Sequence, residues 1–334
     1  MLANFQTYTN PRLTAQSSSK TSSLPEVWAR KYVESLHRQD QALAGLNQSQ
    51  SKADVAQNLL ESLRSISANA WNKTETLIGH EIRRHQISRD LVDPWTIAKD
   101  AHHVYELALD AYANDVSPQR FSVVASKKLG AIRQGHTAMD PRVIGFVSMQ
   151  FHYCGQMLSE AAPPSERPVL HDFFKVVDDQ LYMPLHRAYE AAANYDYDHP
   201  RLKAVRLALP AITGIAHTIV DRVAQAYPRY ATYTGSLSSD VVRTSSVRDV
   251  EMFQIYLLTC VLEDNVGAIA QELFPLCVML YPALRVSWEL VRLMVSLLHQ
   301  EISRCVGRMN MQHFEPYTQV LFDMFSPEFF PDTL

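Results

Sequence analysis

The stretch DPWTIAKDAHHVYELALDAYANDVSPQRFSVVASKKLGAIRQGHTAMDPRVIGFVSMQFHYCGQML, residues 93–158, decides the fold class of this chain. It contains an Asp-Pro, a Ser-Pro and a second Asp-Pro dipeptide, at residues 93–94, 117–118 and 140–141. Aspartate and serine accept backbone N–H bonds at helix starts, and proline fits the first helical position because no N–H donor is needed there. Behind the dipeptides, apolar residues recur at three- and four-residue spacings. The stretch therefore predicts consecutive helices at residues 95–113, 119–133 and 142–162.

The same spacing of apolar residues continues through most of the chain. Further helices are predicted at residues 26–44, 53–67, 74–89, 169–195 with a bend near Pro184, 202–227, 248–272 and 276–308. We therefore expect an all-α protein, a multi-helix bundle of about nine or ten helices, with two subdomains as an alternative to one. The expected organisation is a disordered Ser/Thr-rich tail (1–24), an N-terminal helical region (25–230), a polar linker or hairpin (231–246) and C-terminal core helices (247–334).

The composition is typical of a helical globular protein. Glycine contributes 10 of 334 residues, whereas tight hairpins and phosphate-binding loops use glycine heavily. Hydrophobic residues make up 47% of the chain, enough for a sizeable core, and the net charge of −4 gives no general attraction to nucleic acid or to an anionic membrane. The four cysteines lie far apart without a CxxC pair, so we expect them to be buried and reduced. With no recognisable signal peptide, these features predict a cytoplasmic protein.

Residues 273–298 are the run that most resembles a membrane span. Arg285, Glu289 and Arg292 interrupt it at helical spacing, and charges in lipid are unfavourable by several kcal/mol each. We therefore expect no membrane span. We interpret the three charges as the polar rim of a groove, on a largely buried helix, that binds a protein partner.

Familiar catalytic and metal-binding signatures are missing from the sequence. The chain contains no GxGxxG, GxxxxGK[ST], GxSxG or HExxH motif. His80 and His85 are five residues apart, about 140° round a helix, so they do not share a metal ion as an i, i+4 pair does. Adjacent carboxylates at 178–179 and 263–264 diverge by about 100° and form no facing acid/base couple. We expect neither enzymatic activity nor a metal site.

One stripe of the predicted helix 142–162 is unusually small. Gly145, Ser148, His152 and Gly155 fall within roughly 80° of one another. Such a gap lets a flat ligand approach, and His152 would coordinate or hydrogen-bond it; a tetrapyrrole suits a helical pocket of this kind. The structural alternative, which needs no cofactor, is that two helices cross closely at the glycines while His152 bonds a backbone carbonyl.

A basic cluster lies on the predicted helix 119–133. It consists of Arg120, Lys127, Lys128 and Arg133, in a segment without any acidic residue. Followed by another helix, it is compatible with a fragment of a helix-turn-helix motif that binds nucleic acid. A solvated helix face or a site for an acidic partner explains the same charges, and the acidic chain as a whole makes nucleic acid the weaker hypothesis.

Three stretches resemble an all-helical protein family associated with cyanobacteria. They are DPRVIGFVSMQFHYCGQML (140–158), RDVEMFQIYLLTCVLEDN (248–265) and ELFPLCVMLYPALRVSWELV (272–291), and the resemblance covers roughly residues 55–330. No functional motif of that family can be carried over to this chain. The resemblance implies only a context, a bacterial cytoplasm beside thylakoids, with photosynthetic complexes and tetrapyrroles nearby.

These observations together favour a non-enzymatic intracellular interaction protein. It would act as a scaffold, assembly factor or regulator, burying a partner's apolar helix or tail in a groove between helices. Two alternatives come from other classes: a sensor or carrier of a tetrapyrrole-like molecule at His152, and a nucleic-acid-binding regulator that uses the basic cluster. Self-association into a homo-oligomer is compatible with each of them.

Overall fold

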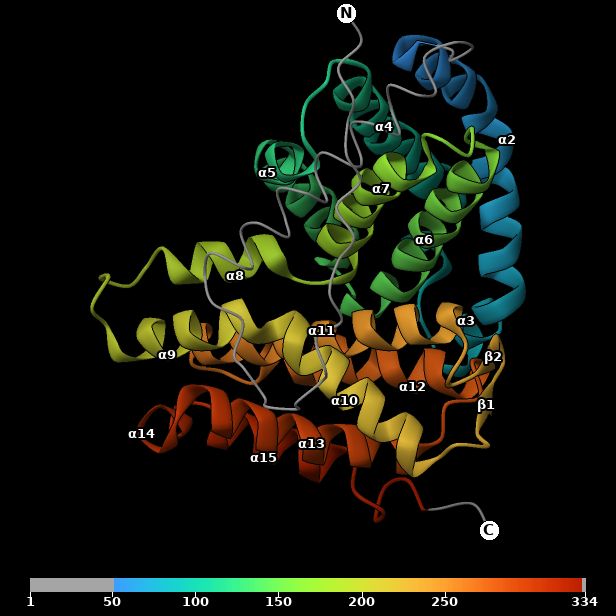
Figure 1. Ribbon diagram of the computed structural model, residues 1–334. Helices are drawn as coiled ribbons and strands as arrows, with labels where there is room; N and C mark the ends of the chain where they lie inside the picture. The colour runs from blue at the N-terminus through green and yellow to red at the C-terminus, as the bar shows by residue number, and fades with distance from the viewer. Residues whose placement is uncertain (1–50, 332–334) are drawn as a thin grey trace, which may run out of the picture. The chain divides into compact units, whose positions relative to one another are not determined.

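The structure is a computed structural model and describes residues 51–331. All regular structure in that range is helical apart from one two-stranded hairpin, so the all-α prediction is confirmed (Figure 1). The expected total of nine or ten helices is approximate, because single-turn helices such as α3 (Glu81–Arg84) and α14 (Arg308–Met311) add to it. The predicted tail at 1–24 and the predicted helix at 26–44 lie outside the described residues.

The N-terminal helices of the described part form one set. Helix α2 packs against α4 and α6, and α7 packs against α5 and α6. Figure 1 shows these helices in the upper part of the view, with α2 along one side. Their bounds are α2 (Lys52–Ile78), α4 (Pro94–Ala113), α5 (Pro118–Thr137), α6 (Ile144–Ala161) and α7 (Arg167–Tyr182), with 3-10 turns at η1 (Arg89–Leu91) and η2 (Pro141–Val143).

The starts of these helices follow the predicted caps. The Asp93 carboxylate accepts the first N–H groups of α4, and the Ser117 hydroxyl accepts the N–H of Arg120 in α5. Asp140 caps in the same way, but its helix begins as the 3-10 turn η2 before α6. The predicted division between helices 53–67 and 74–89 is wrong, because α2 continues without a break and buries one face across both segments.

The C-terminal helices form a second set, which Figure 1 shows lying across beneath the first. Helix α11 packs against α8, α9 and α10, and α13 packs against α9, α10 and α15. Their bounds are α8 (Leu185–Ala192), α9 (Pro200–Ala208), η3 (Leu209–Ala211), α10 (Ile212–Ala226), α11 (Asp240–Glu263), α12 (Phe274–Ala283), α13 (Trp288–Val306) and α15 (Glu315–Met324). The predicted bend near Pro184 is confirmed as the break between α7 and α8.

Two predicted helices of this half are wrong in their limits. The helix at 248–272 is instead α11 followed by a separate π-helix, Ala268–Leu273, because Asp264 adopts a left-handed conformation that ends α11. The helix at 276–308 is divided into α12 and α13, with Arg285 left-handed in the turn and Ser287 capping α13. The polar stretch holds a hairpin of strands β1 (Ala231–Thr232) and β2 (Gly235–Ser236), and α11 begins at Asp240, before the predicted end of that stretch.

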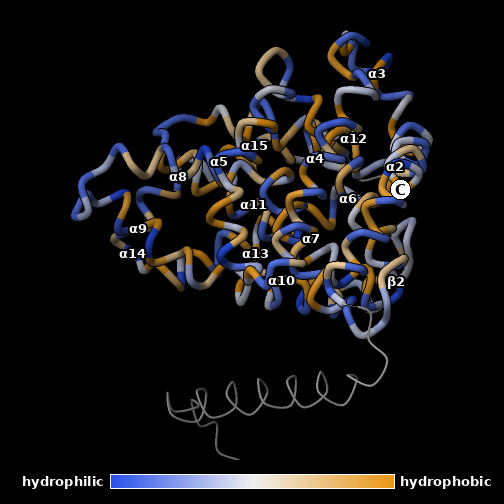
Figure 2. Tube along the Cα trace, turned by 90° about the horizontal axis from the view of Figure 1, so that it is seen from above, coloured by the Kyte–Doolittle hydropathy of each residue, from blue (hydrophilic) through white to orange (hydrophobic). Residues whose placement is uncertain are grey.

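Helix α11 lies at the centre of the hydrophobic core. Every residue from Val250 to Leu262 is buried, including the polar Glu251, Gln254 and Thr259. Figure 2 shows α11 near the middle of the described part, with other helices on all sides of it. Since both sets of helices pack on α11 or on its neighbours, polar side chains on this helix connect the two sets.

The described residues include one run that is long and apolar enough to cross a membrane by length and composition, Pro200–Ala226. It comprises α9, η3 and α10, of which α10 packs on α11 and α13. The apolar run 273–298 is interrupted between α12 and α13, so neither half reaches the roughly 20 residues of a span.

The four cysteines carry free thiols in this structure. Three of them, Cys154, Cys260 and Cys277, are buried, as the sequence predicts, and Cys305 is partly exposed. Burial raises the pKa of the Cys154 thiol to about 12 and that of Cys260 to about 11. These buried thiols behave as small apolar side chains rather than as nucleophiles.

Candidate functional site

A pocket opens between α10, α11 and α13, next to the hairpin; we call it the α10–α13 pocket. Its volume is about 90 Å³, and most of the exposed surface lining it is apolar. The aliphatic lining comes from α10 (Ile219, Val220, Val223, Ala224), the hairpin region (Leu237), α11 (Val250) and the α12–α13 turn with α13 (Val286, Leu290, Val291, Met294). Polar side chains of Thr232, Ser246, Asp249 and Tyr281 complete the wall.

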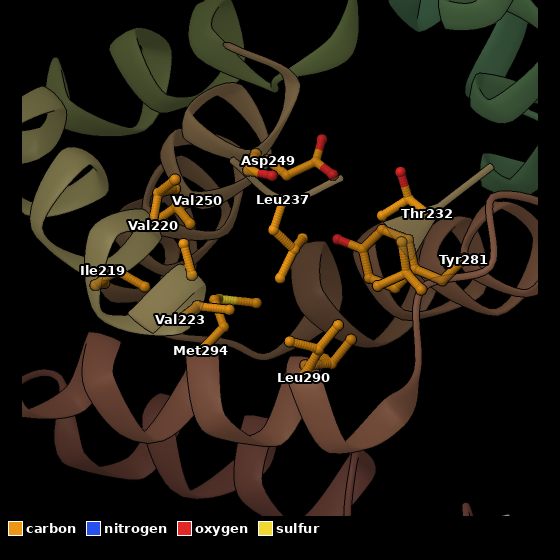
Figure 3. A pocket seen from close by; sticks show the side chains of 14 residues that line it. Ile219, Val220, Val223, Thr232, Leu237, Asp249, Val250, Tyr281, Leu290 and Met294 are labelled. Atoms are coloured by element: carbon orange, nitrogen blue, oxygen red, sulfur yellow. The ribbon is translucent and has the colours of Figure 1, made fainter. Parts of the chain in front are cut away.

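The polar and apolar linings occupy different sides of the pocket. Figure 3 shows the oxygens of Asp249, Thr232 and Tyr281 on one side, and the aliphatic chains of Val223 and Met294 on the other. Asp249 is the charged residue of the lining. The pocket therefore combines an apolar wall with one carboxylate.

The hairpin is fastened beside this pocket by tyrosines. The Tyr230 hydroxyl donates to the carbonyl of Arg285 and accepts the N–H of Ser287, and the N–H of Tyr233 donates to the Leu284 carbonyl. These bonds tie the hairpin to the turn between α12 and α13. They hold Thr232 and Leu237 against the pocket.

Behind the pocket, Asp249 belongs to a group of interacting side chains that reaches His152. We call this group the Asp249 cluster; its members are His152, Asp178, Tyr182, Arg248 and Asp249. The Tyr182 hydroxyl donates to Asp249 at 3.1 Å, and the guanidinium of Arg248 lies 4.5 Å from the centre of the Tyr182 ring. Arg248 donates to the Asp178 carboxylate, and its Nη1 lies 2.8 Å from Nδ1 of His152. The cluster joins α6 and α7 of the first set to α11.

The two carboxylates of the Asp249 cluster differ in their electrostatics. Burial acts to raise the pKa of Asp178, but the charge of Arg248 and the contact with His152 outweigh it, so the pKa lies below its usual range. Burial also raises the pKa of Asp249, and Arg248 and the Tyr182 hydrogen bond offset that rise only in part. Arg248 therefore serves chiefly as the counter-charge of Asp178.

A second buried ionic group, the Arg133 network, joins Arg133, Arg187, Tyr256, Glu263 and Glu272. Arg133 donates to Glu272 at 2.8 Å and to the Tyr256 hydroxyl at 2.7 Å, while Arg187 donates to both Glu263 and Glu272. Glu272 belongs to the π-helix, so the network fixes this segment to α5 and α8. Two arginines and two glutamates balance in charge, which is typical of a structural network.

The structure separates the residues of the small stripe on α6. A Cβ on Gly145 would meet Met279 and Leu276 of α12, whereas one on Gly155 would meet Tyr105 of α4 and Phe174 of α7. Both glycines thus lie where protein side chains approach α6 closely. The Ser148 hydroxyl bonds the Ile144 carbonyl, and His152 is paired with Asp178 and Arg248. The contacts at the two glycines thus come from different helices, and His152 contacts side chains of α7 and α11.

The predicted rim of Arg285, Glu289 and Arg292 divides between two places. Arg285 and Glu289 directly precede Val286 and Leu290, which line the α10–α13 pocket. The Tyr227 hydroxyl donates to Glu289, and Arg285 lies over the Tyr233 ring. Arg292 instead donates to the carbonyls of Phe325 and Phe330, in the C-terminal segment that follows α15. Two of the three residues predicted for the rim therefore directly precede residues that line the pocket.

The basic cluster on α5 is smaller than the sequence suggests. Arg120, Lys127 and Lys128 are exposed, but Arg133 is buried in the Arg133 network. Because Arg133 is held by Glu272 and Tyr256, it does not belong to the exposed basic surface. The exposed Val123 and Val124 lie between the remaining cations.

Within residues 51–331, no three His, Cys, Asp or Glu side chains lie together as the ligands of a metal ion would.

The chain matches no protein-family model, no curated protein and no solved structure. Its resemblance to the cyanobacterial family therefore stays a prediction.

Neither Asp249 nor the α10–α13 pocket was predicted from the sequence. The one available signal was the charged pair at 248–249, which directly precedes the long buried stretch of α11. A charged pair there requires partners from other helices, and only the tertiary structure identifies them.

Proposed function

We propose that this protein is a non-enzymatic binding protein, a scaffold or regulator, that accepts one side chain of a protein partner in the α10–α13 pocket. The size of the pocket carries the proposal. Small-molecule and cofactor sites usually measure roughly 300–1,000 Å³. The observed volume of about 90 Å³ corresponds to about three water molecules, or to one amino-acid side chain.

The surroundings of the pocket support a protein partner. Protein interfaces concentrate their binding energy in a few side chains that enter pockets, surrounded by a polar rim. Here Arg285 and Glu289 flank the lining residues and supply such a rim. The apolar wall supplies the desolvated surface on which an inserted side chain is stabilised.

Filling the pocket tests this function. Ala224 lines the pocket and is only partly buried, so Ala224→Phe would place a ring in it without entering the core. Ala226→Phe, two residues along α10 at an exposed position, is the matched control. We expect a protein that co-purifies with the wild type from its own cells, and binds it again after purification, to bind Ala224→Phe at least about tenfold more weakly. Ala226→Phe should bind it normally.

Native mass spectrometry of the isolated protein provides the opposing outcome. A bound molecule of small-molecule mass that is present in the wild type and absent from Ala224→Phe would contradict the proposal and identify a ligand carrier. Equal partner binding by both phenylalanine variants would show that the partner does not use this pocket.

A further inference from the structure

The charge of the pocket wall indicates which side chain would enter. The Asp249 cluster holds two carboxylates, Asp178 and Asp249, and one guanidinium, Arg248, which donates to Asp178. The carboxylates of the cluster therefore outnumber its guanidinium by one. Within residues 51–331, the Tyr182 hydroxyl is the one hydrogen-bond donor that reaches Asp249. A partly buried charge without a full counter-charge is unfavourable, so the pocket wall favours a cation.

The shape of the lining adds a second requirement. The oxygens of Asp249, Thr232 and Tyr281 lie on one side of the pocket, opposite aliphatic side chains (Figure 3). An ammonium group has three N–H donors, which three oxygen acceptors can satisfy. A lysine side chain also has a four-carbon apolar stem, which packs along an aliphatic wall while its charged end reaches a polar group. Lysine thus matches both sides of the lining.

We propose that the α10–α13 pocket binds a lysine side chain of the partner protein, with its ammonium group at Asp249. This inference rests on the proposed function and specifies the chemistry of the same site.

The n-butylammonium ion reproduces the lysine side chain and is the first probe. We would titrate it, with 1-butanol and butyrate as comparison ligands, against protein labelled with ¹³C at the methionine methyl groups. Met294 lines the pocket and reports binding there, while Met309, 83% exposed on α14, is the internal control. Butylammonium should shift the Met294 signal at about tenfold lower concentration than butanol, and butyrate should not shift it.

Variants then test the role of Asp249 directly. Asp249→Asn should remove the preference for butylammonium over butanol. Asp221→Asn, which removes an exposed carboxylate of α10 paired with Arg243, should keep it. The comparison of the three ligands on the wild-type protein remains decisive if Asp249→Asn does not fold. Acetylation of the partner's lysines should abolish its binding to the wild type.

The outcomes separate this inference from the proposed function. Equal shifts of the Met294 signal by butanol and butylammonium, or no shift by either, would overturn the selection of lysine. The proposed binding of a partner protein would then still be tested by the Ala224→Phe comparison. A bound small amine in the native mass spectrum would overturn the assignment to a partner's side chain. Partner binding that survives lysine acetylation would overturn it as well.

Discussion

At the scale of single residues, two glycines in helices illustrate opposite surroundings. A Cβ on Gly155 would lie 2.9 Å from the Tyr105 hydroxyl, which is fully buried and donates to the Phe151 carbonyl, so it has little freedom to move. A Cβ on Gly214 of α10 would meet nothing within 4 Å. We expect Gly155→Ala to destabilise the protein by about 1–3 kcal/mol and Gly214→Ala to stabilise it by about 0.5–1 kcal/mol. Urea denaturation of both variants measures this, and equal effects would contradict it.

Asp179 makes the stability of the protein depend on pH. Burial raises its pKa to about 6 from an ordinary 3.8, although the ammonium of Lys175 opposes the rise. A carboxyl group whose pKa is higher in the folded state stabilises that state below the unfolded pKa, and this contribution is lost as the pH rises through about 6. Relative to that of Asp179→Asn, the free energy of unfolding of the wild type should fall by about 1–3 kcal/mol between pH 4 and pH 6.5.

Urea denaturation at intervals across that range measures the difference between wild type and Asp179→Asn. Asp172→Asn, at an exposed position on the same helix, is the control for the substitution itself. A difference between wild type and Asp179→Asn that stays constant with pH would show that Asp179 does not titrate there.

Residue-scale features are predictable from the sequence when their causes are local. The Asp93 cap bonds residues two and three positions along the chain, and it was predicted correctly. The role of Arg133 was not, because its partner Glu272 is 139 positions away and comes close only in the folded protein. The same limit applies to Asp249, whose hydroxyl donor lies on a different helix.

At the scale of elements, the π-helix depends on a single carboxylate. Glu272 accepts hydrogen bonds from both Arg133 and Arg187 inside the protein. Glu272→Gln would leave these arginines with too little negative charge, and removing one partner of a buried ion pair destabilises a protein by about 3–5 kcal/mol. Glu190→Gln, which affects an exposed pair with His186, should change stability by less than about 1 kcal/mol. Similar unfolding midpoints for the two variants would contradict a structural role for the network.

The C-terminal segment is held against α13 by aromatic stacking. The ring of Phe330 stacks on Trp288 with centres 4.1 Å apart, whereas the neighbouring Phe329 is mostly exposed. We expect Phe330→Ala to expose Trp288 to water, shift its fluorescence to longer wavelength and destabilise the protein by about 1–3 kcal/mol. Phe329→Ala should leave both properties nearly unchanged. The fluorescence spectrum and the urea midpoint of each variant test this prediction.

Elements were predicted well where a cap marks their start and poorly where they are buried all round. Helices α4 and α5 begin at the predicted prolines. In α12 and in the buried part of α11, Val250–Leu262, most residues are apolar and no polar face alternates with them, so periodicity carries no information about where one helix ends. The division between α12 and α13 follows from the left-handed Arg285, a conformation that the local sequence does not reveal.

At the scale of the whole molecule, the reactivity of the cysteine thiols measures how readily the folded protein opens. Burial raises the thiol pKa of all four cysteines, but Cys154, Cys260 and Cys277 are buried whereas Cys305 is partly exposed. In the native protein we expect one thiol, Cys305, to react readily with a thiol reagent, and the other three to react at the rate of unfolding. Labelling of wild type and Cys305→Ala, followed by mass spectrometry, tests this. Rapid labelling of any other cysteine would reveal local opening of the core.

The fold class of the molecule could be predicted, but its candidate site could not. Scarce glycine and repeated caps are properties of the chain alone, so they indicated an all-α protein correctly. The α10–α13 pocket arises where α10, α11, α13 and the hairpin meet, between residues 219 and 294. No local pattern encodes the space between four elements, and the sequence singled out only Arg285 and Glu289, which directly precede two lining residues.

The complete burial of α11 between Val250 and Leu262 has a consequence for the synthesis of this protein on the ribosome. Helices α2 to α7 emerge first, whereas α13 and α15, which cover α11, are complete only at Met324, 62 residues after Leu262. At about 5–20 residues per second, this interval lasts about 3–12 seconds. During that time the central helix of the core is incompletely covered. Chaperones that bind nascent chains would therefore encounter α11 before its neighbours do.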